Sequence, residues 1–116
     1  MTVRTTLLSA LLSAVALITF AFAASDRAAA QPSWCFKSGL KAAEETICSS
    51  QYLISLDGAL NTAYRRALFD SPNDRRDIRA RQRDWLFLRN GCGFNEACIA
   101  SRYRTQIGYL EGFFAN

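Results

Sequence analysis

The sequence predicts an all-α protein, namely a small disulfide-stapled domain in which a helical hairpin is preceded by a short helix and followed by a further helix. Three observations favour this class. Apolar residues after position 39 recur at three- and four-residue steps, as they do along one side of a helix. No run of residues alternates between apolar and polar as a half-buried strand does. The two prolines, Pro32 and Pro72, both fall outside the expected helices, so neither breaks one.

The first two helices follow an irregular lead-in over residues 31–39. A short helix is expected over residues 40–48, because its apolar residues gather on one face. That face consists of Leu40, Ala43 and Ile47. Ser49 or Ser50 can then cap a second helix, since a serine oxygen accepts a backbone N–H that has no partner within the helix. The apolar stripe of the second helix consists of Leu53, Leu56, Leu60, Tyr64 and Leu68.

The third helix lies beyond a break at Pro72, because proline cannot continue the backbone hydrogen-bond ladder. Asn73 or Asp74 can cap its start, and Asn90-Gly91 can end it in the manner of a C-terminal glycine cap. One face of this helix carries Ile78, Gln82, Trp85 and Arg89.

A fourth helix is expected after Asn95, which can cap it. Its inward positions are Ile99, Tyr103, Ile107 and Leu110. The sequence therefore predicts one core that all the long helices share. The predicted core residues are Leu53, Leu56, Leu60, Tyr64, Trp85, Tyr103, Ile107 and Leu110.

The first thirty residues have the layout of a secretory signal peptide. Arg4 precedes an uncharged apolar stretch over residues 7–22, and small-residue cleavage patterns end at Ala23 and at Ala30. About 16 apolar residues fall short of the ~20 that a membrane-spanning helix needs. We therefore expect residues 1–30 to be removed, with cleavage after Ala23 or Ala30, and no membrane span in the mature protein. The expected location is periplasmic or secreted.

The four cysteines all lie in the mature part of the chain, where two disulfides are expected of a short exported protein. All four fall at one end of the expected hairpin. This arrangement fits sequential pairing, Cys35–Cys48 and Cys92–Cys98, but it also permits Cys48–Cys92. The chain has no histidine, and the cysteine spacings do not form the two close pairs of a four-cysteine zinc site. We therefore expect no metal and no other cofactor.

Four polar residues fall near the same level of the hairpin: Glu44, Asp57, Gln82 and Arg89. Asp57 and Arg89 differ by only ~3 Å along the antiparallel helix axes, so Arg89 could reach Asp57 and also Glu44. The set is either a polar network that holds the helices together or a binding site. Glu44 or Glu45 with Asp57 could in principle cut a glycoside. However, a nearby arginine favours the ionised carboxylate, which makes a poor proton donor. We therefore expect a protein that is not an enzyme.

These positions also form ordered motifs with definite gaps. Their residues are Cys35, Glu44, Ile47 and Cys48 in C-x8-E-x2-I-C, Leu53, Leu56, Asp57, Leu60 and Tyr64 in L-x2-L-D-x2-L-x3-Y, Gln82, Trp85, Arg89 and Cys92 in Q-x2-W-x3-R-x2-C, and then Cys98, Tyr103, Ile107 and Leu110. The pattern resembles the lysozyme-inhibitor LprI-like family over about residues 34–111. It departs from that family at Ile99, where leucine is favoured, and at Gln106, where arginine is usual. The resemblance implies an exported helical domain over residues 31–116, and the family name indicates inhibition of lysozyme.

The first functional hypothesis is therefore an exported, non-enzymatic envelope protein that inhibits a lysozyme-type muramidase by binding to it directly. Removal of the signal peptide leaves a net charge of +3, since Arg4 is lost while Asp26 and Arg27 cancel. Animal lysozymes are also basic, so like-signed fields would slow the encounter between the two proteins. Inhibition would then need a local acidic or hydrogen-bonding insertion. The net-acidic stretch of the chain contains Glu44, Glu45 and Asp57.

Two alternatives remain open. An arginine-rich module could bind an anionic envelope component, because guanidinium groups suit phosphate and carboxylate. The arginines that motivate it are Arg65, Arg66, Arg75, Arg76, Arg79, Arg81 and Arg83. A structural or stress-related interaction protein is the other alternative. Nucleic acid is not an expected partner, because an exported chain would rarely meet it.

Overall fold

A computed structural model describes residues 29–115, and within that range the predicted all-α class is confirmed. The elements, in chain order, are η1 (Ser33–Phe36), α1 (Ala42–Cys48), α2 (Gln51–Asp70), η2 (Pro72–Asp74), α3 (Arg75–Asn90) and α4 (Glu96–Glu111). No strand occurs between residues 29 and 115. The expected signal segment lies almost wholly outside the described residues and stays a prediction. None of the described helices is both long and apolar enough to cross a membrane.

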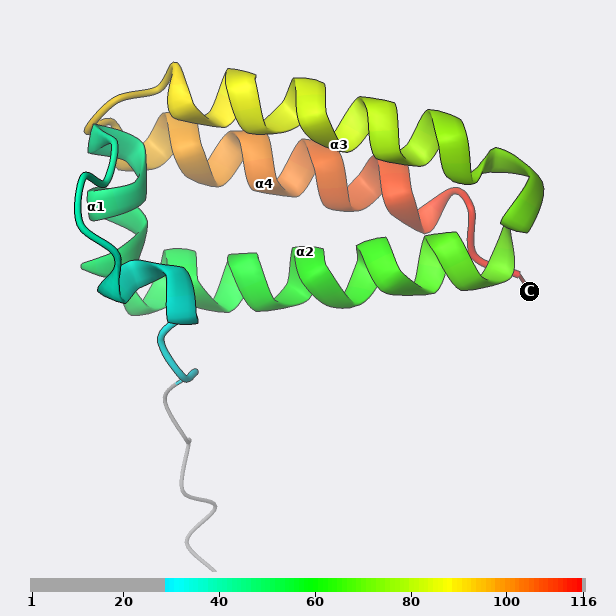
Figure 1. Cartoon of the computed structure of the whole chain (residues 1–116), viewed down its shortest axis with the longest axis horizontal. Helices are drawn as coiled ribbons and strands as arrows, with labels where there is room; N and C mark the ends of the chain where they lie inside the picture. Colours follow the sequence, from blue (N-terminus) through cyan, green and yellow to red (C-terminus); the bar gives the residue numbers. More distant parts are fainter. Residues whose placement is uncertain (1–28, 116) are drawn as a thin grey trace, which may run out of the picture.

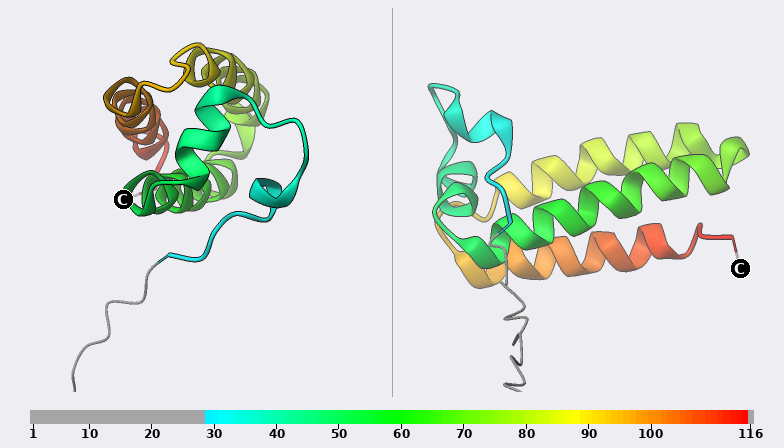
Figure 2. Two further views of the ribbon diagram at one scale, coloured as in Figure 1. Left: turned by 90° about the vertical axis from the view of Figure 1, so that its left-hand side faces the viewer. Right: turned by 90° about the horizontal axis from the view of Figure 1, so that it is seen from below.

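Three long helices run side by side, and the short helix α1 lies across one end of them (Figures 1 and 2). Helices α2 and α3 form the predicted hairpin, joined by the η2 turn. Helix α4 returns in the direction of α2 and packs against both members of the hairpin, while α1 contacts all three long helices. The result is a three-helix bundle that α1 closes at one end.

Two of the predicted caps hold the helix starts as expected. The backbone N–H of Leu53 donates to Ser50 Oγ over 3.3 Å at the start of α2. The backbone N–H of Cys98 donates to Asn95 Oδ1 over 3.0 Å at the start of α4. Both side chains supply an acceptor to a first-turn N–H that has no partner within the helix. The short helix α1 begins at Ala42, two residues later than the apolar pattern predicted.

Two predictions about the ends of α3 need correction. Asp74 occupies the N-cap position, but its side chain accepts no capping hydrogen bond, because the η2 turn leads directly into the helix. Gly91 follows the last helical residue, but its φ of −65° is right-handed, so it is not the left-handed glycine of a C-terminal cap. The left-handed residue is Gly93, with a φ of +58°, which turns the chain toward α4.

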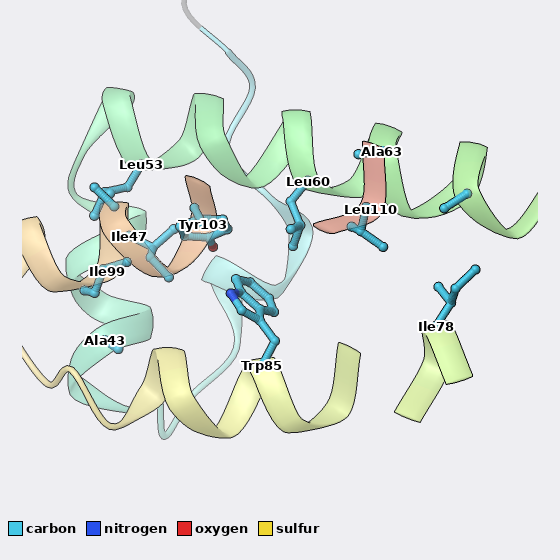
Figure 3. Packing of buried hydrophobic residues seen from close by; sticks show 12 residues of the cluster. Ala43, Ile47, Leu53, Leu60, Ala63, Ile78, Trp85, Ile99, Tyr103 and Leu110 are labelled. Carbon is cyan, nitrogen blue, oxygen red and sulfur yellow. The ribbon is translucent and has the colours of Figure 1, made fainter. Parts of the chain in front are cut away.

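The core is one apolar cluster enclosed by all four α-helices of the described chain (Figure 3). Five of the predicted core residues are buried: Leu53, Leu60, Trp85, Tyr103 and Leu110. Three are partly buried and pack against the cluster: Leu56, Tyr64 and Ile107. The single stripe predicted for α2 missed Ile54, Ala63 and Ala67, which are also buried. Helix α2 has neighbours on more than one side, so its buried face is wider than one stripe.

Two disulfides lie at the end of the bundle that α1 closes. Cys35 bonds to Cys48, which ties η1 to the last residue of α1, and Cys92 bonds to Cys98, which ties the loop after α3 to the first turn of α4. The sequential pairing is therefore correct, and the Cys48–Cys92 alternative is wrong. We call this region, with η1, α1 and both disulfides, the cross-linked end.

Candidate binding site at the cross-linked end

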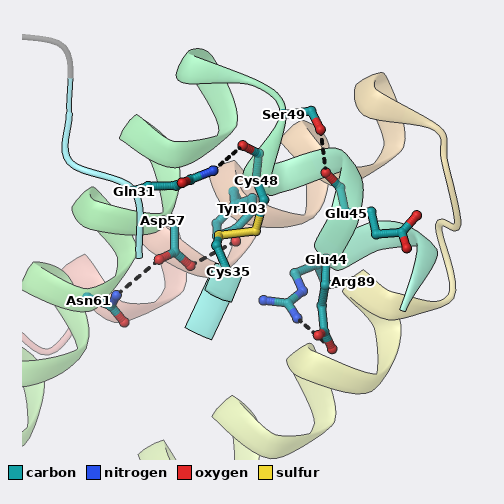
Figure 4. Close-up of a disulfide and its surroundings, with 10 residues drawn as sticks. All are labelled: Gln31, Cys35, Glu44, Glu45, Cys48, Ser49, Asp57, Asn61, Arg89 and Tyr103. Atoms are coloured by element: carbon teal, nitrogen blue, oxygen red, sulfur yellow. Dashed lines mark hydrogen bonds and ion pairs between the residues drawn. A yellow bond between two sulfur atoms is a disulfide. The ribbon is translucent and has the colours of Figure 1, made fainter. Parts of the chain in front are cut away.

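Arg89 is the buried cation of the cross-linked end, with only 5% of its surface exposed. Its Nε and Nη2 atoms donate to Asn90 Oδ1 over 3.1 and 2.8 Å. Nη2 also lies 4.0 Å from Glu44 Oε1 (Figure 4). The guanidinium carbon lies 5.7 Å from the ring centre of Trp34 and 5.4 Å from that of Trp85. One amide, one carboxylate and two indole rings therefore surround this cation, as burial of a charge requires.

Asp57 does not form the ion pair with Arg89 that the hairpin geometry suggested. Its carboxylate accepts from the Tyr103 hydroxyl over 2.9 Å and from Asn61 Nδ2 over 3.3 Å (Figure 4). The expected ion pair came from the positions of Asp57 and Arg89 along the axes of α2 and α3, without regard to the other helices. Helix α4 packs against both of these helices, and its Tyr103 reaches the Asp57 carboxylate.

Tyr103 therefore acts as a fixed hydrogen-bond donor within the core. Burial is the largest cause that raises the pKa of its hydroxyl well above the ordinary tyrosine value, and the Asp57 carboxylate raises it further. Arg89 acts in the opposite direction but does not prevail. The Tyr103 ring packs edge-on against Trp85, with ring centres 5.0 Å apart. These contacts bind α2, α3 and α4 together at the level of the predicted polar set.

Gln82 lies away from Arg89 and helps to join α3 to α4. It accepts from Gln106 Nε2 over 3.0 Å, and the Trp85 indole N–H donates to the backbone oxygen of Arg102 over 2.9 Å. Gln106 is almost fully buried, although the sequence marked it only as a departure from a family pattern. Its position three residues after Tyr103 and four before Leu110 could have placed it on the inward face of α4. The predicted polar set is thus divided between three separate contacts.

A groove of about 600 Å³ opens beside Arg89 at the surface of the cross-linked end. Its lining comes from α1, the end of α3 and the loop that follows. The lining residues are Lys41, Glu44, Leu86, Phe87, Arg89, Asn90 and Gly91. A smaller hollow of about 270 Å³ shares Glu44, Leu86 and Arg89 with it and adds Trp34 and Lys37. Lysines, one carboxylate and exposed apolar side chains together suit contact with a protein or peptide surface.

Two of the three acidic side chains that were expected to form a local insertion already contact partners within the fold. Asp57 is buried, and Glu44 lies against Arg89 with about a fifth of its side chain exposed. Glu45 is the exposed member, on the outer side of α1 (Figure 4). Every fully buried side-chain nitrogen and oxygen within residues 29–115 has a hydrogen-bond partner. The polar residues therefore form a network that stabilises the fold. The groove beside them is the candidate site for contact with a partner.

The same described range contains no group of three or more histidine, cysteine, aspartate or glutamate residues that could hold a metal ion. Comparison with protein families finds a match to the family described as "Lysozyme inhibitor LprI" over residues 35–112. That range begins at the first disulfide-bonded cysteine and ends one residue after α4. Comparisons with curated proteins and with solved structures found no match.

Proposed function

The chain belongs to the lysozyme inhibitor LprI family, and on this basis we propose that it is an exported, non-enzymatic protein that inhibits a peptidoglycan-cleaving muramidase by binding to it directly. The observation that carries the proposal is the extent of the family match. Residues 35–112 include both disulfides and all four α-helices described above. The match therefore covers a whole folded domain and not an isolated motif.

The scaffold suits an inhibitor that binds without much rearrangement. Two disulfides and one shared core hold the groove-forming segments, so little ordering free energy is lost when a partner binds. The groove of the cross-linked end offers exposed charge beside apolar side chains. Disulfides also persist in oxidising compartments, which supports a periplasmic or secreted location together with the expected signal peptide.

A non-enzymatic role agrees with how the candidate carboxylates are used. Asp57 accepts two hydrogen bonds within the core, and Glu44 lies against a buried arginine. A glycosidase needs two carboxyl groups that face the substrate together. The Asp57 carboxylate instead faces Tyr103 of α4 and Asn61 of its own helix, and Glu44 faces Arg89 of α3, which favours a structural role for both.

The proposal can be tested by titrating muramidases of several types with the purified, disulfide-intact protein. We expect hydrolysis of peptidoglycan to fall in proportion to the added protein and to cease near one equivalent. Reduced and alkylated protein serves as the control, because loss of both disulfides should remove the folded surface. No inhibition of any muramidase type at micromolar excess would sink the proposal.

The alternative function, binding of an anionic envelope component by arginines, has fewer arginines available than the sequence suggested. Several of them make contacts within the molecule. Arg66 pairs with Asp70 at 3.3 Å, Arg75 donates to the Leu68 backbone oxygen over 2.7 Å, and Arg81 lies over the Tyr109 ring. These three guanidinium groups already have partners. The other exposed arginines of α3 are Arg76, Arg79 and Arg83.

A further inference from the structure

Helix α3 carries an outward face that adds nothing to the core. Arg76, Arg79 and Arg83 are exposed, and steps of three and four residues place them along one side of the helix. Phe87 follows four residues after Arg83 and is 81% exposed. The buried side of the same helix carries Ile78, Trp85 and Arg89. We call the first four residues, Arg76, Arg79, Arg83 and Phe87, the arginine face.

The three cations of this face make no hydrogen bond or ion pair with the part of the chain that the structure describes. The nearest acids along the helix, Asp77 and Asp84, each follow an arginine by one residue and so point about 100° away round the helix. Like charges four residues apart, such as Arg79 and Arg83, destabilise a helix slightly. An exposed phenylalanine likewise contributes little to the stability of the fold. None of these side chains is needed by the core, so the face is free to contact a partner.

We infer that the arginine face docks into the substrate cleft of the muramidase, with Arg79 and Arg83 against its paired catalytic carboxylates. This inference rests on the proposed function. Glycoside-cleaving enzymes carry two carboxyl groups about 5–9.5 Å apart. Arg79 and Arg83 lie about 6 Å apart along the helix axis, and their long side chains allow the two guanidinium groups to reach carboxylates at such spacings. A guanidinium group binds a carboxylate through two parallel hydrogen bonds, which lysine cannot do.

Shape and apolar contact support the same occupant. A helix is a convex rod of about 10–12 Å diameter, which suits a concave cleft built to hold a chain of sugars. Phe87 lies about 6 Å further along the axis than Arg83, where it can fill an apolar sugar-binding position next to the carboxylates. Phe87 also lines the groove of the cross-linked end, so Lys41 and Gly91 would meet the rim of the cleft.

The charge of the whole protein and the charge of this face act at different stages of binding. A basic muramidase would be repelled at long range by the net positive charge of this chain. Arginine–carboxylate contacts form only after docking, so they slow dissociation and leave the association rate nearly unchanged. The local acidic insertion expected from the sequence is not needed, because the partner supplies the acidic groups.

The test compares inhibition by the full disulfide-intact protein with inhibition by the double variant R79Q/R83Q and by F87A. A soluble chito-oligosaccharide is the substrate, so that competition with substrate can be measured. We expect the concentration of unaltered protein that halves the rate to rise with substrate concentration after pre-equilibration of all three components, because protein and substrate compete for the cleft. R79Q/R83Q should weaken inhibition by about a hundredfold and F87A by about tenfold. The charge-matched control R65Q/R102Q removes two exposed arginines from α2 and α4 and should inhibit normally.

Each contrary outcome points to a different failure. If the unaltered protein inhibits and R79Q/R83Q inhibits equally well, docking through the arginine face is wrong and the proposed function still stands. A half-inhibiting concentration that does not change with substrate concentration would also overturn docking in the cleft. Full inhibition by R79Q/R83Q together with lost binding to polyphosphate would assign the face to an anionic polymer instead. No inhibition by the unaltered protein would remove the proposed function and this inference together. Urea unfolding of each variant separates lost contact from lost folding.

Discussion

Arginine and aromatic side chains occur on both sides of α3, but they are buried with partners on one side and exposed on the other. Arg89 is buried between two tryptophans and has a carboxylate and an amide as partners, whereas Arg83 is exposed and has no such partner within the described chain. Trp85 lies in the core with its N–H bonded to α4, whereas Phe87, two residues later, is mostly exposed. The difference arises because α1, α2 and α4 all pack against α3 and bury the side that carries Ile78, Trp85 and Arg89.

This contrast separates residues that maintain the fold from residues free to meet a partner. On the inner side, each cation and aromatic ring has neighbours on other helices, so a change there should lower the free energy of unfolding. On the outer side, similar residues have no internal partners, so a change there should alter binding and leave the fold intact. The family pattern contains Trp85 and Arg89 but not Arg83 and Phe87, so it marks residues of the inner side and says nothing about the outer side.

The largest expected effect is on folding, from removal of the inner aromatic side chain. Trp85→Ala should lower the free energy of unfolding by about 3–5 kcal/mol, because it leaves a cavity and removes an interhelical hydrogen bond. Phe87→Ala should change it by less than about 0.5 kcal/mol. Urea unfolding followed by far-ultraviolet circular dichroism measures both values. A loss from Phe87→Ala as large as that from Trp85→Ala would break the contrast between the two sides.

The disulfides should come next, because they hold the elements that bury the inner side. Cys35→Ser with Cys48→Ser opens a loop with a sequence separation of 13 residues, and Cys92→Ser with Cys98→Ser opens one of 6. Chain entropy then predicts losses of about 3 and about 2 kcal/mol respectively. Urea unfolding checks the order of the two losses. Thiol titration of the unfolded, unreduced protein should detect no free thiol, and two or four thiols would contradict the cross-links.

The two arginines give the most direct contrast of stability. Arg89→Gln should cost about 1–3 kcal/mol, because it removes the cation that faces Glu44 and donates to Asn90. Arg83→Gln should be neutral or stabilising by a few tenths of a kcal/mol, because it relieves repulsion from Arg79. Equal losses from both substitutions, measured by urea unfolding, would show that the outer arginine also supports the fold.

The smallest effect concerns pH and the Tyr103 hydroxyl. The raised pKa means that the folded protein keeps this proton at pH values where the unfolded chain has released it. The contribution of the Tyr103 hydroxyl to the free energy of unfolding is therefore complete below about pH 10, the ordinary tyrosine pKa. It is lost as the pH rises above that value. Tyr103→Phe should be about 1 kcal/mol less stable at neutral pH and should lack this alkaline loss.

The check is urea unfolding of both proteins across an alkaline pH series, with Tyr109→Phe as the control. The gap in stability between the unaltered protein and Tyr103→Phe should narrow above about pH 10. A gap that stays constant to higher pH would mean that the Tyr103 hydroxyl does not titrate differently in the folded state. The control should retain the full alkaline loss.

The features that could be predicted from the sequence are those that depend on residues close together in the chain. Ser50 and Asn95 cap their helices because a side-chain acceptor at that position satisfies the first turn locally. The order of the helices follows from the spacing of apolar residues. The cysteine pairing was left open, because clustering at one end permits more than one pairing until the position of η1 is known.

The remaining features depend on how the helices pack, which spacing along one helix cannot provide. The partner of Asp57 was missed because Tyr103 comes from a fourth element, 46 residues away in sequence. Gly91 was assigned the left-handed turn that Gly93 makes, because the disulfide-closed loop places the turn two residues later. The seven arginines could not be sorted into partnered and outward-facing groups, since that depends on where α2 and α4 lie beside α3.

The position of the partner can be mapped residue by residue from backbone amide chemical shifts of the labelled, disulfide-intact protein on addition of a muramidase that it inhibits. We expect the shifts that change to follow the outward side of α3 over residues 76–87 and to extend to Lys41 and Gly91 at the groove. Amides of the inner contacts, such as Tyr103 and Gln106, should change little. Changes confined to α2 and α4, with the outward side of α3 unaffected, would contradict the division of α3 into a side that supports the fold and a side that meets the enzyme.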